Sequence, residues 1–353
     1  MREKKGLLIN SISLVIVVII AVFVAVIFYS FATDLSLTEI GRILLHGAVG
    51  SKHTITECLV IATPLILAGL GIAFAFKAGL WNIGAEGQLY AGAIGATFIA
   101  LNLSAPAPLH MLLIIIGAFL AGGAWAAIPG VFKAKLGVNE ILTTIMMNFI
   151  AIWIVHYLIY GPWRDLSLSR PQTSFFPTSA WLPIIVPDSR LYAGLLLGII
   201  CVILTYVVFK YTRLGYAIKM LGANPKAAQY GGISLSKTIM ITMFISGGLA
   251  GLAGMGLVCG LYHYLIDAQY QISPGYGYYA IGVALLGGLS PWGTLLAGIF
   301  FGFLMGAASY LKAMAGMHAE SLFLIVGLIL LAVLARGIFT GLLKRLPGLR
   351  GRE

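Results

Sequence analysis

The sequence predicts an all-α, polytopic membrane protein with about ten transmembrane helices. The 353 residues are 60% hydrophobic and only 9% charged, whereas roughly a quarter of the residues in a soluble domain carry charge. The mean hydropathy is +1.00, and apolar runs of about 20 residues, the length that crosses a bilayer, recur along the chain. The 44 glycines fit the same class, because small residues let membrane helices approach closely.

Apolar run length and helix breakers place the expected helices within a single transmembrane domain, 1–353. The first run, 7–31, follows a basic N-terminal segment, 1–6, and exceeds the apolar part of a cleaved signal peptide. It is therefore expected to be a retained span. Ten spans divide into two halves of five, and an odd number per half would invert one half relative to the other. The remaining expected spans are 57–76, 88–104, 109–132, 140–160, 191–209, 238–258, 275–290, 292–311 and 320–336.

The basic residues lie between the apolar runs, as the positive-inside rule expects. This distribution argues against nucleic-acid binding despite the formal net charge of +11, and lipid is the expected surrounding. With a cytoplasmic N-terminus, most of the 22 lysines and arginines fall on the cytoplasmic side. Both termini, including the tail 337–353, are therefore predicted to be cytoplasmic. The basic residues expected outside are Arg42, Lys52, Arg164, Arg170, Arg190 and Lys312.

Sequence motifs for chemistry are missing. The dipeptide Gly-Lys does not occur, so the chain has no G-x-x-x-x-G-K-[ST] phosphate cradle, and it has no H-E-x-x-H, G-x-S-x-G or C-x-x-C motif. Few acidic residues fall inside the expected spans, which gives little support to a proton or sodium relay. We expect no catalytic residue, metal site or cofactor in this chain, and a transporter rather than a membrane-embedded enzyme.

A polar stretch, "GLWNIGAEGQLYAG" (79–92), follows the second span directly after Lys77. Gly79, Gly84 and Gly87 are expected to break the helix there. Irregular backbone persists at membrane depth only where it is buried in protein or lines a watery cavity, and interrupted helices mark the sites of many transporters. The predicted pathway residues in this stretch are Trp81, Asn82, Glu86 and Gln88.

A polar stripe follows one face of the expected span 140–160. Glu140, Thr144 and Asn148 recur at every fourth position, so they share a helix face. The stripe either lines the pathway or forms hydrogen bonds between helices. We include Thr144 and Asn148, together with Tyr278 of the span 275–290, among the candidate pathway residues.

Two hydrophilic segments are long enough to have functions of their own. The extracellular loop 161–190 contains five prolines and several aromatic residues, so it is either a docking surface or an inert cap. In the cytoplasmic segment 210–237, Asn224 is a good N-cap and Pro225 suits the first helical position. Gly231 or Gly232 can end that helix in the left-handed region. Such a short helix either enters a groove on another protein or is a connecting turn.

Five stretches together resemble the permease subunits of bacterial ABC importers of the ribose and branched-chain amino acid type. Within that group the chain is most similar to the nucleoside permeases that work with a basic membrane protein-type lipoprotein. The stretches occur in a fixed order over most of the chain: "GLWNIGAEGQLYAGAIGA" (79–96), "GVNEILTTIMMNFIA" (137–151), "TRLGYAIKMLGANPKAAQYGGIS" (212–234), "SGGLAGLAG" (246–254) and "GYGYYAIGVALLGGLSPWGTLLAG" (275–298).

The resemblance implies a permease that translocates nucleosides across the bacterial inner membrane. It implies three protein partners: a cytoplasmic ATPase that binds ATP and Mg, a second homologous permease, and an extracellular substrate-binding lipoprotein. Alternatives are a sugar or branched-chain amino acid as cargo, or an ion-coupled secondary transporter. The resemblance also makes 210–237 the segment that couples to the ATPase, through Arg213, Gly215, Gly222, Asn224, Pro225, Ala227, Ala228 and Gly231.

Overall fold

The computed structural model describes residues 26–27, 30, 35–267, 272–315 and 327. The expected spans 7–31 and 320–336 lie almost wholly outside these residues, as do both termini. The chain divides into two compact units. The larger comprises residues 59–302, and the smaller comprises the parts of 1–58 and 303–353 that are described.

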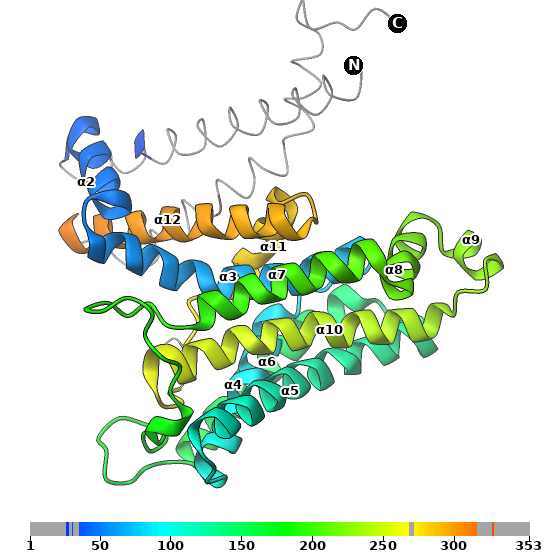
Figure 1. Cartoon of the computed structure of the whole chain (residues 1–353), viewed down its shortest axis with the longest axis horizontal. Helices are drawn as coiled ribbons and strands as arrows, with labels where there is room; N and C mark the ends of the chain where they lie inside the picture. Colours follow the sequence, from blue (N-terminus) through cyan, green and yellow to red (C-terminus); the bar gives the residue numbers. More distant parts are fainter. Residues whose placement is uncertain (1–25, 28–29, 31–34, 268–271, 316–326, 328–353) are drawn as a thin grey trace, which may run out of the picture. The chain divides into compact units, whose positions relative to one another are not determined.

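The described residues are predominantly helical (Figure 1). Within the described residues, six helical segments are long and apolar enough to cross a membrane, namely α3, α5, α6, α7, α12 and α10 continued through η2. They confirm six of the eight expected spans between 57 and 311, with bounds that differ by about five residues at most. The other two expected spans, 88–104 and 275–290, correspond to α4 and to α11, which has only 11 residues. The elements are α2 (Leu37–Val49), α3 (Lys52–Lys77), α4 (Ala85–Asn102), α5 (Ala107–Leu136), α6 (Glu140–Tyr160), η1 (Thr178–Ala180), α7 (Gly194–Tyr211), α8 (Arg213–Ala223), α9 (Pro225–Tyr230), α10 (Leu235–Gly256), the π-helical η2 (Leu257–Tyr262), α11 (Tyr276–Leu286) and α12 (Pro291–Ala315).

The smaller unit contains α2, which the sequence analysis did not predict. Ser36 caps this helix, accepting a hydrogen bond from the Glu39 backbone N–H while the Glu39 side chain accepts one from the Ser36 backbone N–H. This reciprocal pair is a capping box. The pattern Ser-x-x-Glu was therefore present in the sequence as a signal for the helix.

Glycines hold the centre of the larger unit together. The helices α4, α5 and α10 pack against one another, and they meet where a side chain would not fit. A Cβ on Gly92 would overlap the backbone of Gly251, and a Cβ on Gly254 would overlap the Leu89 carbonyl oxygen. Close backbone approach of this kind is how helices associate in lipid, where no hydrophobic drive favours their contact.

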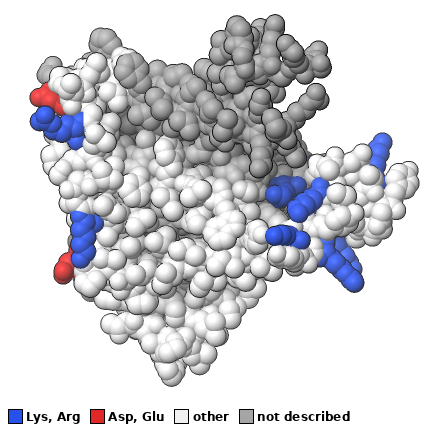
Figure 2. All heavy atoms as spheres, turned by 45° about the horizontal axis from the view of Figure 1, so that its top comes forward, with Lys and Arg blue, Asp and Glu red and all other residues white. Residues whose placement is uncertain are grey.

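The larger unit has two distinct ends (Figure 1). One end carries α8 and α9, and the start of α10 is tied there to the end of α5 by a Ser236 Oγ–Ala134 carbonyl hydrogen bond of 2.9 Å. The loop 161–193 lies at the other end, where the Leu182 N–H donates to the Cys259 carbonyl at 2.9 Å. Basic side chains gather at one end of the molecule (Figure 2). The lysines and arginines in α8 and α9 and at the neighbouring ends of α3, α5, α7 and α10 are Lys77, Lys133, Lys135, Lys210, Arg213, Lys219, Lys226 and Lys237.

Candidate functional site

The predicted break between the second and third spans is present. After Lys77 the chain turns through Gly79, whose φ of +75° lies in the left-handed region that favours glycine. The Leu80 N–H closes this turn on the Ala75 carbonyl at 3.0 Å. No helix forms again until Ala85, where α4 begins with Gly84 at its N-cap. Residues 78–84, which we call the broken segment, therefore carry the chain from the α8–α9 end to the first turn of α4.

The expectation that Gly87 also breaks the helix is wrong, because Gly87 lies inside the first turn of α4. Its missing side chain serves a different purpose. A Cβ at this position would come within 2.8 Å of the Asn148 Cα on α6. The Gly87 N–H instead donates to the Asn148 Oδ1 at 2.8 Å. Glycine is needed here for close contact between two helices and not for backbone freedom.

Two amide side chains of the polar stretch bind each other. Asn82 Nδ2 donates to Gln88 Oε1 at 2.9 Å, and Gln88 Nε2 donates back to Asn82 Oδ1 at 2.8 Å. Asn82 Nδ2 also donates to the Ser246 Oγ of α10 at 2.8 Å, and both amides are buried. This reciprocal pair fixes the broken segment to the first turn of α4 and to α10.

The polar stripe of α6 faces the broken segment. Asn148 Nδ2 donates to the Ile83 carbonyl at 2.9 Å, and the Ile83 N–H points at the Thr144 Oγ1 at 3.3 Å. Asn148 therefore serves both a carbonyl of the broken segment and an N–H of the first turn of α4. Thr144 and Asn148 were expected either to line the pathway or to form hydrogen bonds between helices. The geometry shows them forming hydrogen bonds with the broken segment.

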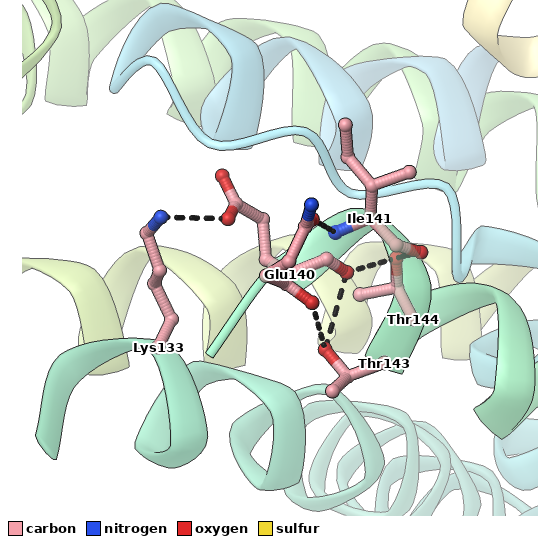
Figure 3. A network of polar contacts seen from close by, with 6 residues as sticks. Lys133, Glu140, Ile141, Thr143 and Thr144 are labelled. Carbon is pink, nitrogen blue, oxygen red and sulfur yellow. Dashed lines mark hydrogen bonds and ion pairs between the residues drawn. The ribbon is translucent and has the colours of Figure 1, made fainter. Parts of the chain in front are cut away.

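Glu140, the first residue of α6, begins the same stripe and belongs to a network of polar contacts (Figure 3). Its carboxylate is 2.8 Å from the Lys133 Nζ of α5, and it also interacts with the backbone of Trp81. Its carbonyl accepts hydrogen bonds from the hydroxyls of Thr143 and Thr144. The network joins α5 and α6 and touches the broken segment.

Glu86 is buried and reaches from α4 to α11. Its Oε2 accepts a hydrogen bond of 2.7 Å from the Gly277 N–H, and its carboxylate also interacts with the Ser273 side chain. The Ser273 Oγ in turn accepts from the backbone N–H of Tyr276 at 2.9 Å. The first N–H groups of a helix have no partner within the helix. In α11, Glu86 and Ser273 accept hydrogen bonds from two of these groups.

The first turns of α4 and α11 are in direct contact. A Cβ on Gly277 would overlap the backbone of Glu86. The two helices run in opposite senses: α4 leads away from the α8–α9 end, whereas α11 leads towards it, since Leu289 beyond α11 accepts a hydrogen bond from Lys77. α4 follows the broken segment after α3, and the described residues between η2 and α11, 263–267 and 272–275, are likewise not helical. Two inverted halves would produce such a pair.

Two of the predicted pathway residues reach the surface of the larger unit. Trp81 is 49% exposed and Tyr278 is 38% exposed, and both are aromatic. The Tyr278 hydroxyl lies 3.3 Å from the Asn148 Nδ2, which places α11 beside α6 at this point. The other five, Asn82, Glu86, Gln88, Thr144 and Asn148, are buried with hydrogen-bond partners inside the protein.

The short helix predicted in the segment 210–237 is α9, with Pro225 as its first residue. Asn224 caps it as predicted, its Oδ1 accepting from the Ala227 N–H at 3.1 Å. Gly232, with φ +80°, takes up the left-handed conformation, whereas Gly231 has φ −76°. Ala228 is buried against the rest of the protein, while Ala227 is exposed. The exposed side of α9 also carries Lys226, Gln229 and Tyr230.

The preceding helix α8, which begins at Arg213, was not predicted as a separate element. Thr212 caps it by accepting a hydrogen bond from the Gly215 N–H at 3.1 Å. A Cβ on Gly215 would overlap the Val208 carbonyl of α7, and a Cβ on Gly222 would overlap the Lys77 carbonyl of α3. Glycines near both ends of α8 thus let it lie directly on the ends of α7 and α3. Thr212 is a local N-cap signal for α8, but the contact with α3 is tertiary and has no local signature.

Comparison with known proteins places the chain in a family. The model of the family described as "Branched-chain amino acid transport system / permease component" matches residues 54–344. A glucose ABC transporter permease of Haloferax volcanii is 37% identical over 82% of this chain and 78% of its own length. A guanosine ABC transporter permease of Bacillus subtilis is 35% identical over 82% of this chain and 83% of its own length.

A nucleoside ABC transporter permease of Lactococcus lactis is 36% identical over 75% of this chain and 75% of its own length. No solved structure matches the chain significantly. The family match covers the broken segment, the buried polar network and the helices α8 and α9. The chain therefore belongs to the branched-chain amino acid transport system permease family, and it is a multi-pass protein of the cell membrane.

Proposed function

We propose that the chain is the membrane-spanning permease subunit of an ABC importer that carries nucleosides. Membership of the permease family supports the transport role, and relatives named for guanosine and for nucleosides, 35% and 36% identical, support the cargo. ATP and Mg bind to a separate cytoplasmic ATPase. The chain itself provides a passage and a surface on which the ATPase acts.

The capping of α4 and α11 is the observation that carries the choice of an uncharged cargo. A helix N-terminus attracts anions, because its free N–H groups and its dipole favour negative charge. Here the Gly87 N–H of α4 is taken by Asn148, and the Gly277 N–H of α11 is taken by Glu86. The carboxylate of an amino acid, or a phosphate, would have to displace these side chains. A nucleoside, which carries no charge, does not need either helix end.

The cargo route follows the exposed face that carries Trp81 and Tyr278. The buried polar side chains behind this face bind each other, so a route between them would require breaking several hydrogen bonds without replacement. The irregular backbone beside the exposed Trp81 is poorly suited to lipid. We infer that a second, homologous permease covers this face and that the cargo passes between the two subunits. Aromatic side chains there can stack on a nucleobase.

The opposite end of the unit provides the docking surface for a substrate-binding lipoprotein. The loop 161–193 is joined to α5 by a buried histidine: His110 Nδ1 lies within hydrogen-bond distance, 2.8 Å, of the Ser179 Oγ. In the same loop the Trp181 ring stacks on the ring of His263, with centroids 4.0 Å apart. Apolar side chains on a fixed loop are suited to a protein partner. Those exposed here are Leu166, Phe175, Trp181, Ile184 and Ile185.

A sugar is the second candidate cargo. The relative named for glucose is 37% identical to this chain, and a sugar is also uncharged, so the capped helix ends accept it equally well. The aromatic pair Trp81 and Tyr278 favours the nucleoside, whose base offers a flat face for stacking. A branched-chain amino acid fits less well because of its carboxylate.

Competition uptake separates these cargoes. Radiolabelled guanosine is offered to proteoliposomes that contain the chain with its ATPase, second permease and lipoprotein, and unlabelled guanosine, glucose, leucine or guanosine monophosphate is added in excess. We expect ATP-dependent uptake that guanosine suppresses by about tenfold or more, since a competitor at ten times its Kd occupies most sites, and that the other three leave unchanged. Suppression by glucose would establish the sugar alternative. Undiminished uptake without the ATPase would support ion coupling and contradict the proposal.

A further inference from the structure

The end of α3 is contacted by three other elements at one residue. The Lys77 carbonyl lies against Gly222 of α8, with no room for a Cβ between them. The Lys77 Nζ donates a hydrogen bond of 3.1 Å to the Leu289 carbonyl, in the turn between α11 and α12. It also lies over the Phe209 ring of α7, 4.8 Å from the centroid. Immediately after Lys77 the helix ends and the broken segment begins.

From this contact we propose that Gly222 and Lys77 are the positioning residues through which movement of α8 and α9 reaches the broken segment. The inference rests on the proposed function, in which α8 and α9 receive the ATPase. It adds the route by which a displacement at that surface is passed to the face that carries Trp81. Gly222 supplies the close backbone contact, and the Lys77 side chain joins the same point to the turn after α11.

α8 is built to move as a rigid body. It is capped by Thr212 at its start, and its own side chains Ile218 and Leu221 are buried against the rest of the protein. Because Gly222 lies on the α3 backbone and not on a flexible side chain, a shift of α8 cannot be absorbed by a change of rotamer. Two backbones in direct contact cannot adjust in this way, because the interior is close-packed.

The broken segment transmits this shift because it is held at both ends and is not helical between them. At one end the turn at Gly79 follows Lys77 directly, and the Gly222 Cα lies 3.5 Å from where a Cβ on Gly79 would be. At the other end Ile83 is bound to Asn148 of α6. Trp81 lies between these two points and is exposed. A displacement of Gly222 therefore changes the position of Trp81 relative to α6.

The Lys77 side chain provides a second connection, from the end of α3 to the turn after α11. Leu289 and Gly288, with φ of +54° and +62°, form a turn whose backbone is outside any helix. This turn follows α11, and α11 is bound to α4 at its other end through Gly277 and Glu86. Lys77 thus contacts α8 through its carbonyl and the turn after α11 through its ammonium, and α11 is in turn bound to α4.

The test measures uptake per ATP hydrolysed, because a merely structural role for these residues would not change that ratio. Guanosine uptake and ATP hydrolysis are followed in the same proteoliposomes containing the complete complex. Two variants are compared with wild type. Gly222→Ala separates α8 from α3, and Lys77→Met keeps the apolar part of the side chain but removes the ammonium. The control is Gly198→Ala in α7, where an added Cβ would lie 3.6 Å from Ile66 in ordinary van der Waals contact.

We expect both variants to co-purify with the ATPase and to hydrolyse ATP at nearly the wild-type rate. Uptake per ATP should fall by about fivefold or more, as expected for loss of coupling between two sites, whereas Gly198→Ala should keep the wild-type ratio. Lys77→Met tests the route even if Gly222→Ala does not fold. Uptake and hydrolysis that fall in parallel, or a ratio that does not change, would overturn the route while leaving the proposed function intact. Wild-type vesicles that take up no guanosine would overturn the proposed function, and the route with it.

Discussion

Gly254→Ala is expected to remove most of the folded protein from the membrane. The added Cβ would overlap the Leu89 carbonyl oxygen of α4, and neither backbone can move aside without separating α4 from α10. Overpacking of a well-packed interior costs about 3 kcal/mol at the upper end of its range, which lowers the ratio of folded to unfolded protein by about a hundredfold. The measurement is the yield of monodisperse protein after detergent extraction, followed by size-exclusion chromatography with a fluorescent tag.

The matched control for this variant is again Gly198→Ala, because it adds the same methyl group to a membrane helix where space exists. We expect it to retain the wild-type yield. Equal yields for Gly254→Ala and Gly198→Ala would mean that α4 and α10 do not approach each other as closely as described.

Asn148→Leu is expected to destabilise the first turn of α4 and to abolish uptake. Leucine branches at the same carbon as asparagine but can neither accept from the Gly87 N–H nor donate to the Ile83 carbonyl. Each buried backbone group left without a partner costs about 1–3 kcal/mol, so the loss of both costs about 2–6 kcal/mol. The thermal midpoint of the purified protein should therefore fall by several degrees, and uptake by the complete complex should be lost.

Asn102→Leu controls for the loss of an amide as such. Asn102 lies at the exposed end of α4, where its side chain bonds only the Phe98 carbonyl of its own helix. Water or lipid headgroups can replace that bond, so a change in midpoint within experimental error is expected. If Asn148→Leu is as stable and as active as Asn102→Leu, then Asn148 does not hold the broken segment.

The membrane spans could be predicted from the sequence because each depends on local properties. An apolar run such as 140–160 must be helical in lipid, whatever its neighbours are, and α6 has these bounds. The N-cap of α9 could be predicted for the same reason, because Asn224 and Pro225 are adjacent in sequence and act within the first turn of the helix. Glycine near Trp81 also correctly indicated the break.

What the sequence could not provide was the partner of each polar group. Gly87 looks like a helix breaker in isolation, and only its contact with Asn148 explains why glycine is needed in a regular helix. Likewise, the spacing of Thr144 and Asn148 predicted a shared face, but their position against the broken segment depends on how α6 packs. The contact between Gly222 and Lys77 joins residues 145 positions apart in sequence, and no local pattern encodes it.

The central claim is that cargo moves along the face carrying Trp81 and Tyr278, and thiol labelling tests it most directly. Trp81→Cys and Tyr278→Cys are made separately in a chain whose three native cysteines, all buried, are replaced by alanine. Leu204→Cys, on the exposed apolar face of α7, serves as the lipid-facing control. A water-soluble maleimide reacts with the thiolate, which forms in water and not in lipid.

In the assembled complex we expect Trp81→Cys and Tyr278→Cys to be labelled readily and guanosine to slow the labelling of both, while Leu204→Cys stays unlabelled. Labelling of Trp81→Cys and Tyr278→Cys that is as slow as that of Leu204→Cys would contradict the account, because it would mean that this face borders lipid and not a solvated passage.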